Sequence, residues 1–135
     1  MTLQLSTTVR NNMLDQIEAT VGTTAIIRIR TGAQPANCGT ADAGTVLATV
    51  TLPSDWMNAA SGGTKTKLGT WEDASADAAG TAAHFRLYDS AGTTCGAQGS
   101  VTATGGGGDM TVDNVVFAVA QDFVITSFTF TAGNP

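Results

Sequence analysis

The fold is decided at residues 25–30, which read Ala-Ile-Ile-Arg-Ile-Arg. Before this stretch apolar residues recur at every fourth position, and within it the period changes to two. Ala25, Ile27 and Ile29 therefore share one face of an extended chain, and the intervening Ile and Arg side chains share the other. This alternation predicts a β-strand, and it marks the point where the chain passes from helix to sheet.

One amphipathic helix is expected before this strand, over about residues 6–21. Its apolar stripe contains Leu14 and four residues spaced by four positions, which are Val9, Met13, Ile17 and Val21. Ser6 or Thr7 is a suitable N-cap, and Gly22 suits the position just after the last turn. Two interpretations remain open. The helix seals one face or end of a sheet, or it is an arm that docks on a neighbouring subunit.

After residue 30, short β-like segments alternate with turn sequences rich in Gly, Asp and Ser. We expect further strands at residues 46–52, 64–71, 82–89, 100–104, 110–113 (with a continuation to 120 left open) and 123–131. Because no helix separates them, we predict a mainly β protein, an antiparallel β-sandwich or jelly-roll-like barrel with one N-terminal α-helix. The whole chain, 1–135, forms a single domain with the sandwich over residues 23–132.

Composition excludes several kinds of partner. Only 13% of the residues are charged, and the formal net charge is −5. Nucleic acids and acidic membranes repel such an anion, so we expect neither as a partner. The longest apolar run, residues 115–120, is far shorter than the roughly 20 residues that span a bilayer. No targeting signal is evident at residues 1–12, and we therefore expect a soluble protein made in a cytoplasm.

The residues that could perform chemistry are few and scattered. The only histidine, His84, lies in a predicted strand, on the face shared with Arg86 and Tyr88, which we expect to be exposed to solvent. Zinc needs about four closely spaced ligands, which this chain does not offer. Three acidic residues, Glu72, Asp73 and Asp77, lie in a loop of small residues. We expect solvent to surround these carboxylates, without the apolar burial that raises a pKa. Weak cation binding by the three carboxylates is the alternative. We therefore expect no enzyme, catalytic residue, metal or cofactor.

The two cysteines and the two tryptophans leave structural questions open. Cys38 and Cys95 both lie in Gly- and Thr-rich loops, and they can form a disulfide only if the fold brings those loops together. Trp56 and Trp71 either cap the core or anchor an interface, where tryptophan is enriched. The candidate interface residues are Val9, Met13, Trp56, Met57 and Trp71.

Three phrases of the sequence carry a resemblance to a known class of protein. They read Ile-Ile-Arg-Ile-Arg-Thr-Gly-Ala-Gln-Pro-Ala-Asn-Cys at residues 26–38, Phe-Arg-Leu-Tyr-Asp-Ser-Ala-Gly at 85–92 and Ile-Thr-Ser-Phe-Thr-Phe-Thr at 125–131. Together with the amphipathic opening helix, they resemble small structural proteins of tailed bacteriophages. The resemblance extends over most of the chain and includes no catalytic signature.

The resemblance implies a capsid decoration (cement) protein that stabilises neighbouring capsid subunits on the outside of the virion. It also implies assembly in the host cytoplasm, with the major capsid protein and copies of itself as partners. A protein of the tail or collar is one alternative. Another is a carbohydrate- or receptor-binding β-sandwich, for which Trp56 with Asn58 is the only candidate platform. A small hydrolase ranks last, because it requires a pocket that joins His84 to a Ser or an acid.

Overall fold

The computed structural model describes residues 2–134 and shows a mainly β protein with one N-terminal helix. Helix α1 spans Thr7–Val21, and eleven strands follow it. Their bounds are β1 Ile26–Arg30, β2 Val46–Thr51, β3 Thr64–Thr66, β4 Glu72–Asp73, β5 Gly80–Thr81, β6 His84–Tyr88, β7 Cys95–Ala103, β8 Met110–Val112, β9 Val116–Phe117, β10 Phe123–Val124 and β11 Thr129–Thr131.

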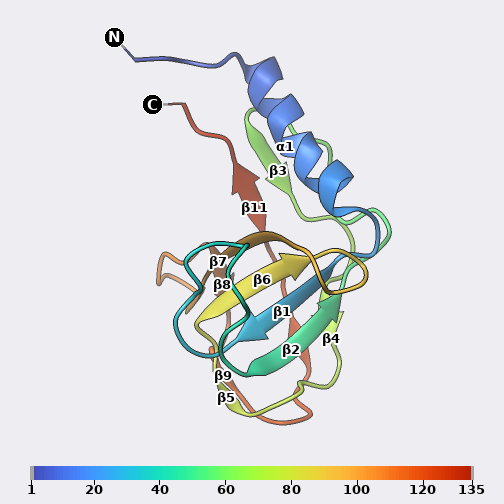
Figure 1. Cartoon of the computed structure of the whole chain (residues 1–135), viewed down its shortest axis with the longest axis vertical. Coiled ribbons are helices and arrows are strands. Elements are labelled where there is room, and N and C mark those ends of the chain that lie inside the picture. Colours follow the sequence, from blue (N-terminus) through green and yellow to red (C-terminus); the bar gives the residue numbers. More distant parts are fainter. Residues whose placement is uncertain (1, 135) are drawn as a thin grey trace.

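The main sheet has five strands in the order β2-β1-β6-β7-β8 and curls into a half-barrel (Figure 1). Three two-stranded sheets complete the fold, formed by β3 with β11, β4 with β10 and β5 with β9. The β3–β11 pair lies beside α1 at one end of the long axis, and β5 and β9 lie at the other end (Figure 1). The chain termini are both at the α1 end.

The expected all-antiparallel arrangement is wrong at one edge of the main sheet. Strands β7 and β8 are parallel, with Val101 opposite Met110 and Ala103 opposite Val112. The connection between them contains four consecutive glycines, and two of these, Gly105 and Gly107, have positive φ. Because glycine adopts such angles without a steric penalty, the chain can loop back and enter β8 in the direction of β7. The sheet is therefore mixed.

The helix begins and ends where the sequence predicts. The Ser6 side chain accepts a hydrogen bond from the Val9 N–H, and the Gly22 N–H donates to the Glu18 carbonyl at the last turn. Leu14 and Val21 are buried, whereas Val9 and Met13 are exposed, so only the C-terminal part of the apolar stripe packs on the sheet. One stripe thus covers the core at its C-terminal end and meets solvent at its N-terminal end.

Two predicted strands are shorter than expected. The segment 64–71 is extended only at β3, and the segment 123–131 divides into β10 and β11. Between those two strands Ile125 and Phe128 are buried and the two residues between them are exposed. A run of β-branched and aromatic residues favours a strand, but side chains three positions apart lie on opposite faces of a regular strand, so burying both interrupts it.

The core lies between the concave main sheet and the small sheets. Trp71 packs against both Trp56 and Phe128, with ring centroids 6.1 and 5.6 Å apart. Phe85 from the centre of the main sheet meets Phe128 edge to face at 5.5 Å. These rings join the main sheet to the β3–β11 end of the molecule.

Candidate functional site

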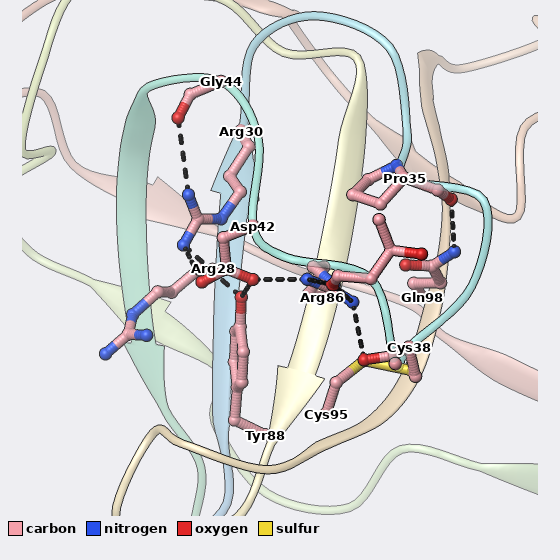
Figure 2. Close-up of polar contacts among 12 residues, drawn as sticks. Arg28, Arg30, Pro35, Cys38, Asp42, Gly44, Arg86, Tyr88, Cys95 and Gln98 are labelled. Atoms are coloured by element: carbon pink, nitrogen blue, oxygen red, sulfur yellow. Dashed lines mark hydrogen bonds and ion pairs between the residues drawn. A yellow bond between two sulfur atoms is a disulfide. The ribbon is translucent and has the colours of Figure 1, made fainter.

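The face of β6 that was expected to be exposed to solvent is covered by another part of the chain. Every residue of β6 is buried, including His84, Arg86 and Tyr88. A loop of residues 31–45, which we call the covering loop, folds over this face between β1 and β2 (Figure 2). The prediction is wrong because alternation along a strand shows which side chains share a face, but not whether a distant loop covers that face.

Arg86 holds the covering loop at its centre. Its guanidinium donates to the carbonyl oxygens of Asn37, Cys38 and Thr40 at 3.0–3.2 Å. It also forms an ion pair with the Asp42 carboxylate, and its side chain is only 2% exposed. Several planar N–H donors can satisfy several loop carbonyls at once, which an ammonium group could not do with the same geometry.

Asp42 joins Arg86 to a second arginine and a tyrosine (Figure 2). Its carboxylate accepts hydrogen bonds from Arg30 Nη2 at 2.8 Å and from the Tyr88 hydroxyl at 2.7 Å. Arg28 stacks over the Tyr88 ring, with its guanidinium carbon 4.9 Å from the ring centroid. The cluster is thus a network in which Arg30, Arg86 and Tyr88 of the main sheet meet on the one carboxylate of the covering loop.

The network shifts the pKa values of two of its members. Burial opposes ionisation of Asp42, but hydrogen bonds from Tyr88 and Arg86 and the charges of Arg30 and Arg86 outweigh it, so the pKa of the Asp42 carboxyl lies below its ordinary value. Burial and the hydrogen bond to Asp42 raise the pKa of the Tyr88 hydroxyl. Both shifts favour the protonation states that the network needs, an ionised Asp42 and a neutral Tyr88.

The fold brings the two cysteines together, which the sequence had left open. Cys38 of the covering loop and Cys95 at the start of β7 form a disulfide, with 5.2 Å between their Cα atoms (Figure 2). Gln98, also on β7, donates to the Pro35 carbonyl at 2.7 Å. The covering loop is therefore fixed to the sheet by one covalent bond and by hydrogen bonds from several residues of β1, β6 and β7.

His84 lies beneath the same loop and has no accessible surface. Its Nδ1 is 2.9 Å from the Gly32 carbonyl oxygen, which places the proton on Nδ1, and its Nε2 is buried without a hydrogen-bond partner. A substrate in solvent has no access to this ring. Within residues 2–134, no group of three or more His, Cys, Asp or Glu side chains could hold a metal ion.

A second charged cluster attaches α1 to the rest of the chain. Lys65 of β3 is 3% exposed and places its ammonium group 2.8 Å from Asp15 and 3.4 Å from Glu18. Glu18 also accepts the backbone N–H groups of Trp56 and Met57. The hydrogen bonds from Lys65 and from the Ala60 backbone lower the pKa of the Asp15 carboxyl. The open groove here, about 750 Å³, is lined by Lys65, by its two partners Asp15 and Glu18, and by Asp55.

The structure separates the predicted interface residues into two groups. Trp56, Met57 and Trp71 are buried in the core, so the other interpretation of the tryptophans, that they cap the core, describes where they lie. Val9 and Met13 are 44% and 54% exposed on α1. Only these two offer side-chain surface to a partner.

Val9 and Met13 belong to a larger, mainly apolar surface. We call residues 2–13 the N-terminal arm, which contains an extended segment followed by the first turns of α1. Leu3 and Leu5 of this arm are also exposed, at 82% and 36%. The only charged residue of the arm, Arg10, donates to the Ala132 carbonyl at 3.0 Å.

The arm keeps its place against the C-terminal segment of the chain. The Asn134 side chain accepts from the Leu5 N–H and donates to the Leu5 carbonyl, both at 2.9 Å, as a neighbouring strand would. Leu3 and Leu5 were not among the predicted interface residues, since a short apolar pattern ahead of a helix is common. The sequence signal for them is that apolar residues recur at positions 3, 5, 9 and 13.

Comparison with known proteins adds no relative: no protein-family model, no curated protein and no solved structure matches this chain. No helix within residues 2–134 is long and apolar enough to cross a membrane.

Proposed function

We propose that this chain is a non-enzymatic structural protein of a bacteriophage virion, a capsid decoration protein that stabilises neighbouring capsid subunits. The observation that carries the proposal is the N-terminal arm, on which Leu3, Leu5, Val9 and Met13 are exposed and Arg10 is the one charged residue. Exposed apolar groups that gather at one place favour a protein contact. The phrase-level resemblance to phage structural proteins supplies the identity of the partner, the major capsid protein.

The rest of the molecule suits a permanent building block. The covering loop is bonded covalently and by Arg86, and the core contains both tryptophans. In this proposal the main sheet and the small sheets act together as a rigid, sandwich-like body, while the arm makes the contact with the capsid. Many symmetric copies then multiply a modest contact into a large stabilisation of the shell. The protein sits on the capsid exterior after assembly in the host cytoplasm.

A tail or collar location remains the alternative within the same class, and the copy number separates the two. Quantitative mass spectrometry and electron microscopy of purified particles should show hundreds of copies on the head lattice. Six or twelve copies near the tail would favour the alternative. Absence of the chain from the particles would overturn the proposal.

The role of the arm is tested by binding to particles that lack this chain. We expect the double variant Val9→Thr, Met13→Gln to bind at least about tenfold more weakly, because it removes apolar contact area. Its thermal unfolding should be unchanged, since both side chains are exposed in the free protein. Leu68→Gln, at another exposed apolar residue, is the matched control and should bind as the unmodified chain does. Equal binding by both variants would exclude the arm as the contact.

A further inference from the structure

We propose that the end of the molecule opposite the arm is a second docking surface, and that it fits a protein surface that exposes Lys or Arg side chains together with apolar ones. We call residues 72–81 and 113–124 the tip. The inference deepens the proposed function, because a protein that bridges subunits needs two separate contacts. The inference rests on the proposed function in one respect only, which is that the partner is a protein of the same virion.

The two segments of the tip form one continuous surface. Strand β4 pairs with β10, and β5 pairs with β9, so the segments are hydrogen-bonded at both ends. Between these pairs, the Ala76 N–H donates to the Gln121 carbonyl at 2.7 Å. Figure 1 places β5 and β9 at the end of the long axis farthest from the arm.

Three valines of the tip are exposed to solvent. Val116, Val119 and Val124 are 58%, 66% and 43% exposed. Val119 lies on a turn that the fold holds closely, with Ala118 N–H bonded to the Gln121 side chain at 2.9 Å and Ala120 N–H bonded to the Ala76 carbonyl at 2.9 Å. This turn keeps Ala120 at a φ of +64°, which a non-glycine residue adopts only where its surroundings require it. Val119 is thus presented by a fixed turn, and Val116 and Val124 by the strands β9 and β10.

The tip is acidic and contains no positively charged side chain. It holds five carboxylates and no Lys, Arg or His, namely Glu72, Asp73, Asp77, Asp113 and Asp122. None of them forms an ion pair within residues 2–134. The chain as a whole has a net charge of −5, so the tip accounts for all of it and the remainder is balanced. A hollow of about 230 Å³ lies between Asp113 and Asp122, smaller than a ligand pocket of ordinary size.

The charge of the tip determines which partner it fits. Anionic nucleic acids and membranes are repelled. A second copy of this chain is a poor match, because it carries the same net charge of −5 and three of its six cationic side chains, Arg30, Lys65 and Arg86, are buried in ion pairs. Each of the other three donates to a carbonyl group of its own chain: Arg10 to Ala132, Arg28 to Gly92 and Lys67 to Gly69. The partner is therefore a different protein with exposed basic side chains, and complementary charge gives such a contact its specificity and its sensitivity to salt.

Binding to particles that lack this chain is the first test. At low salt we expect the triple variant Glu72→Gln, Asp113→Asn, Asp122→Asn to bind at least about tenfold more weakly than the unmodified chain, and to lose most of the salt dependence of binding. The variant Val116→Thr, Val119→Thr keeps the β-branched shape and should weaken binding at every salt concentration. Asp55→Asn, an exposed carboxylate outside the tip, is the control and should change nothing.

A zero-length carbodiimide, which joins a carboxylate to a lysine amine in direct contact, gives an independent readout on whole particles. We expect cross-links from Glu72, Asp113 or Asp122 to lysines of another particle protein. Tip variants that bind as the unmodified chain does, or cross-links confined to carboxylates outside the tip, would overturn the inference while leaving the role of the arm intact.

If the unmodified chain does not bind particles, the proposed function fails and the tip is tested with a synthetic helical peptide of alternating Leu and Lys faces. NMR signals of the tip should shift on titration with this peptide, and the triple variant should remove the shifts. Shifts spread over the whole surface, or none at all, would reject the tip as a docking surface by themselves.

Discussion

Arg86 shows how much of this fold depends on one side chain. It reaches the covering loop from the centre of the main sheet and is bonded to three loop carbonyls and to Asp42. Water reaches almost none of it, since the side chain is 2% exposed. If the guanidinium were removed, the carbonyls and the carboxylate would lose their donors in a place where water replaces them poorly.

Replacing Arg86 with Met should therefore lower the free energy of unfolding by about 3 kcal/mol. Urea denaturation followed by tryptophan fluorescence measures this, because both tryptophans are buried. The control is Arg28→Met, which removes one hydrogen bond to Gly92 and the stacking on Tyr88, and should cost about 1 kcal/mol. A cost for Arg86→Met no larger than that of the control would show that the network does not hold the loop.

The same network makes stability depend on pH in the acidic range. The pKa of Asp42 is lower in the folded chain than its ordinary value of 3.8, so the stability it contributes is complete above pH 3.8 and is lost as the pH falls through the folded value. The pKa values of Asp15 and Asp109 are lowered as well, by hydrogen bonds from Lys65 and from Ser100. The unfolding temperature should be level near neutral pH and fall below about pH 4.

Thermal unfolding from pH 7 to pH 2 measures this profile. Asp42→Asn should be less stable at neutral pH and should lose less stability on acidification than the unmodified chain. An identical loss in both proteins would assign the acid sensitivity to other carboxylates.

At the scale of elements, the covering loop is the part of the chain with the most independent attachments. Its base is closed where the Thr31 N–H donates to the Thr45 carbonyl at 3.0 Å, and its middle is held by Arg86 and by the disulfide. Gly44 at the base has a φ of +77°, and a Cβ there would lie 1.9 Å from the Thr31 carbonyl oxygen. Only glycine fits this close approach.

Removing the disulfide should destabilise the protein without unfolding it. Cys38 and Cys95 are 57 positions apart, and a cross-link of that length contributes about 4 kcal/mol when its effect comes from the entropy of the unfolded chain. The fold should persist because Arg86 and Gln98 still bind the covering loop. Urea denaturation with and without reductant, and of the variant Cys38→Ser, Cys95→Ser, measures the difference. A reductant effect that persists in the double Ser variant would have another origin.

The contact between α1 and β7 depends on a missing side chain. A Cβ at Gly96 would lie 2.5 Å from Val21 Cγ2, so Gly96→Ala must displace the end of α1. We expect a loss of about 1–3 kcal/mol in the free energy of unfolding. Gly133→Ala is the matched control, since its Cβ would meet nothing within 4 Å, and it should change stability by less than about 0.5 kcal/mol. If both variants are equally stable, the helix end is not packed as the structure shows.

At the scale of the whole molecule, apolar surface and charge are divided between two ends. The mainly apolar arm lies at one end of the long axis, and the acidic tip at the other (Figure 1). Besides its contact with the capsid, we expect the arm to make contact between copies, because its exposed residues Leu3, Leu5, Val9 and Met13 carry no charge that would repel their symmetric equivalents. The tip should keep two copies apart, because like charges would face one another.

Self-association should therefore depend on the arm and not on the tip. Sedimentation equilibrium should give a mass above 13.6 kDa for the unmodified chain, and a mass nearer to that of one chain for Val9→Thr, Met13→Gln. The tip variant Val116→Thr, Val119→Thr should associate as the unmodified chain does. A mass of one chain at every concentration would contradict self-association in solution.

The sequence by itself determined the local structure of this protein. Residues 25–30 specify a strand because their side chains alternate, and residues 7–21 specify a helix because the apolar spacing, the Ser6 cap and Gly22 agree. These signals act over a few residues, so they can be read without knowing the rest of the fold. Val9 and Met13 could also be predicted as interface residues from the sequence, because they form one end of an apolar stripe that is longer than the part packed on the sheet.

The tertiary structure alone decided what covers each face. Whether Cys38 meets Cys95, whether Arg86 is wet or buried, and whether β8 runs parallel to β7 all depend on segments far apart in the chain. The acidic tip likewise arises because residues 72–81 fold against residues 113–124, which leaves the rest of the chain with no net charge. Local propensity carries no information about such pairings, since their free energy appears only when the distant groups are in contact.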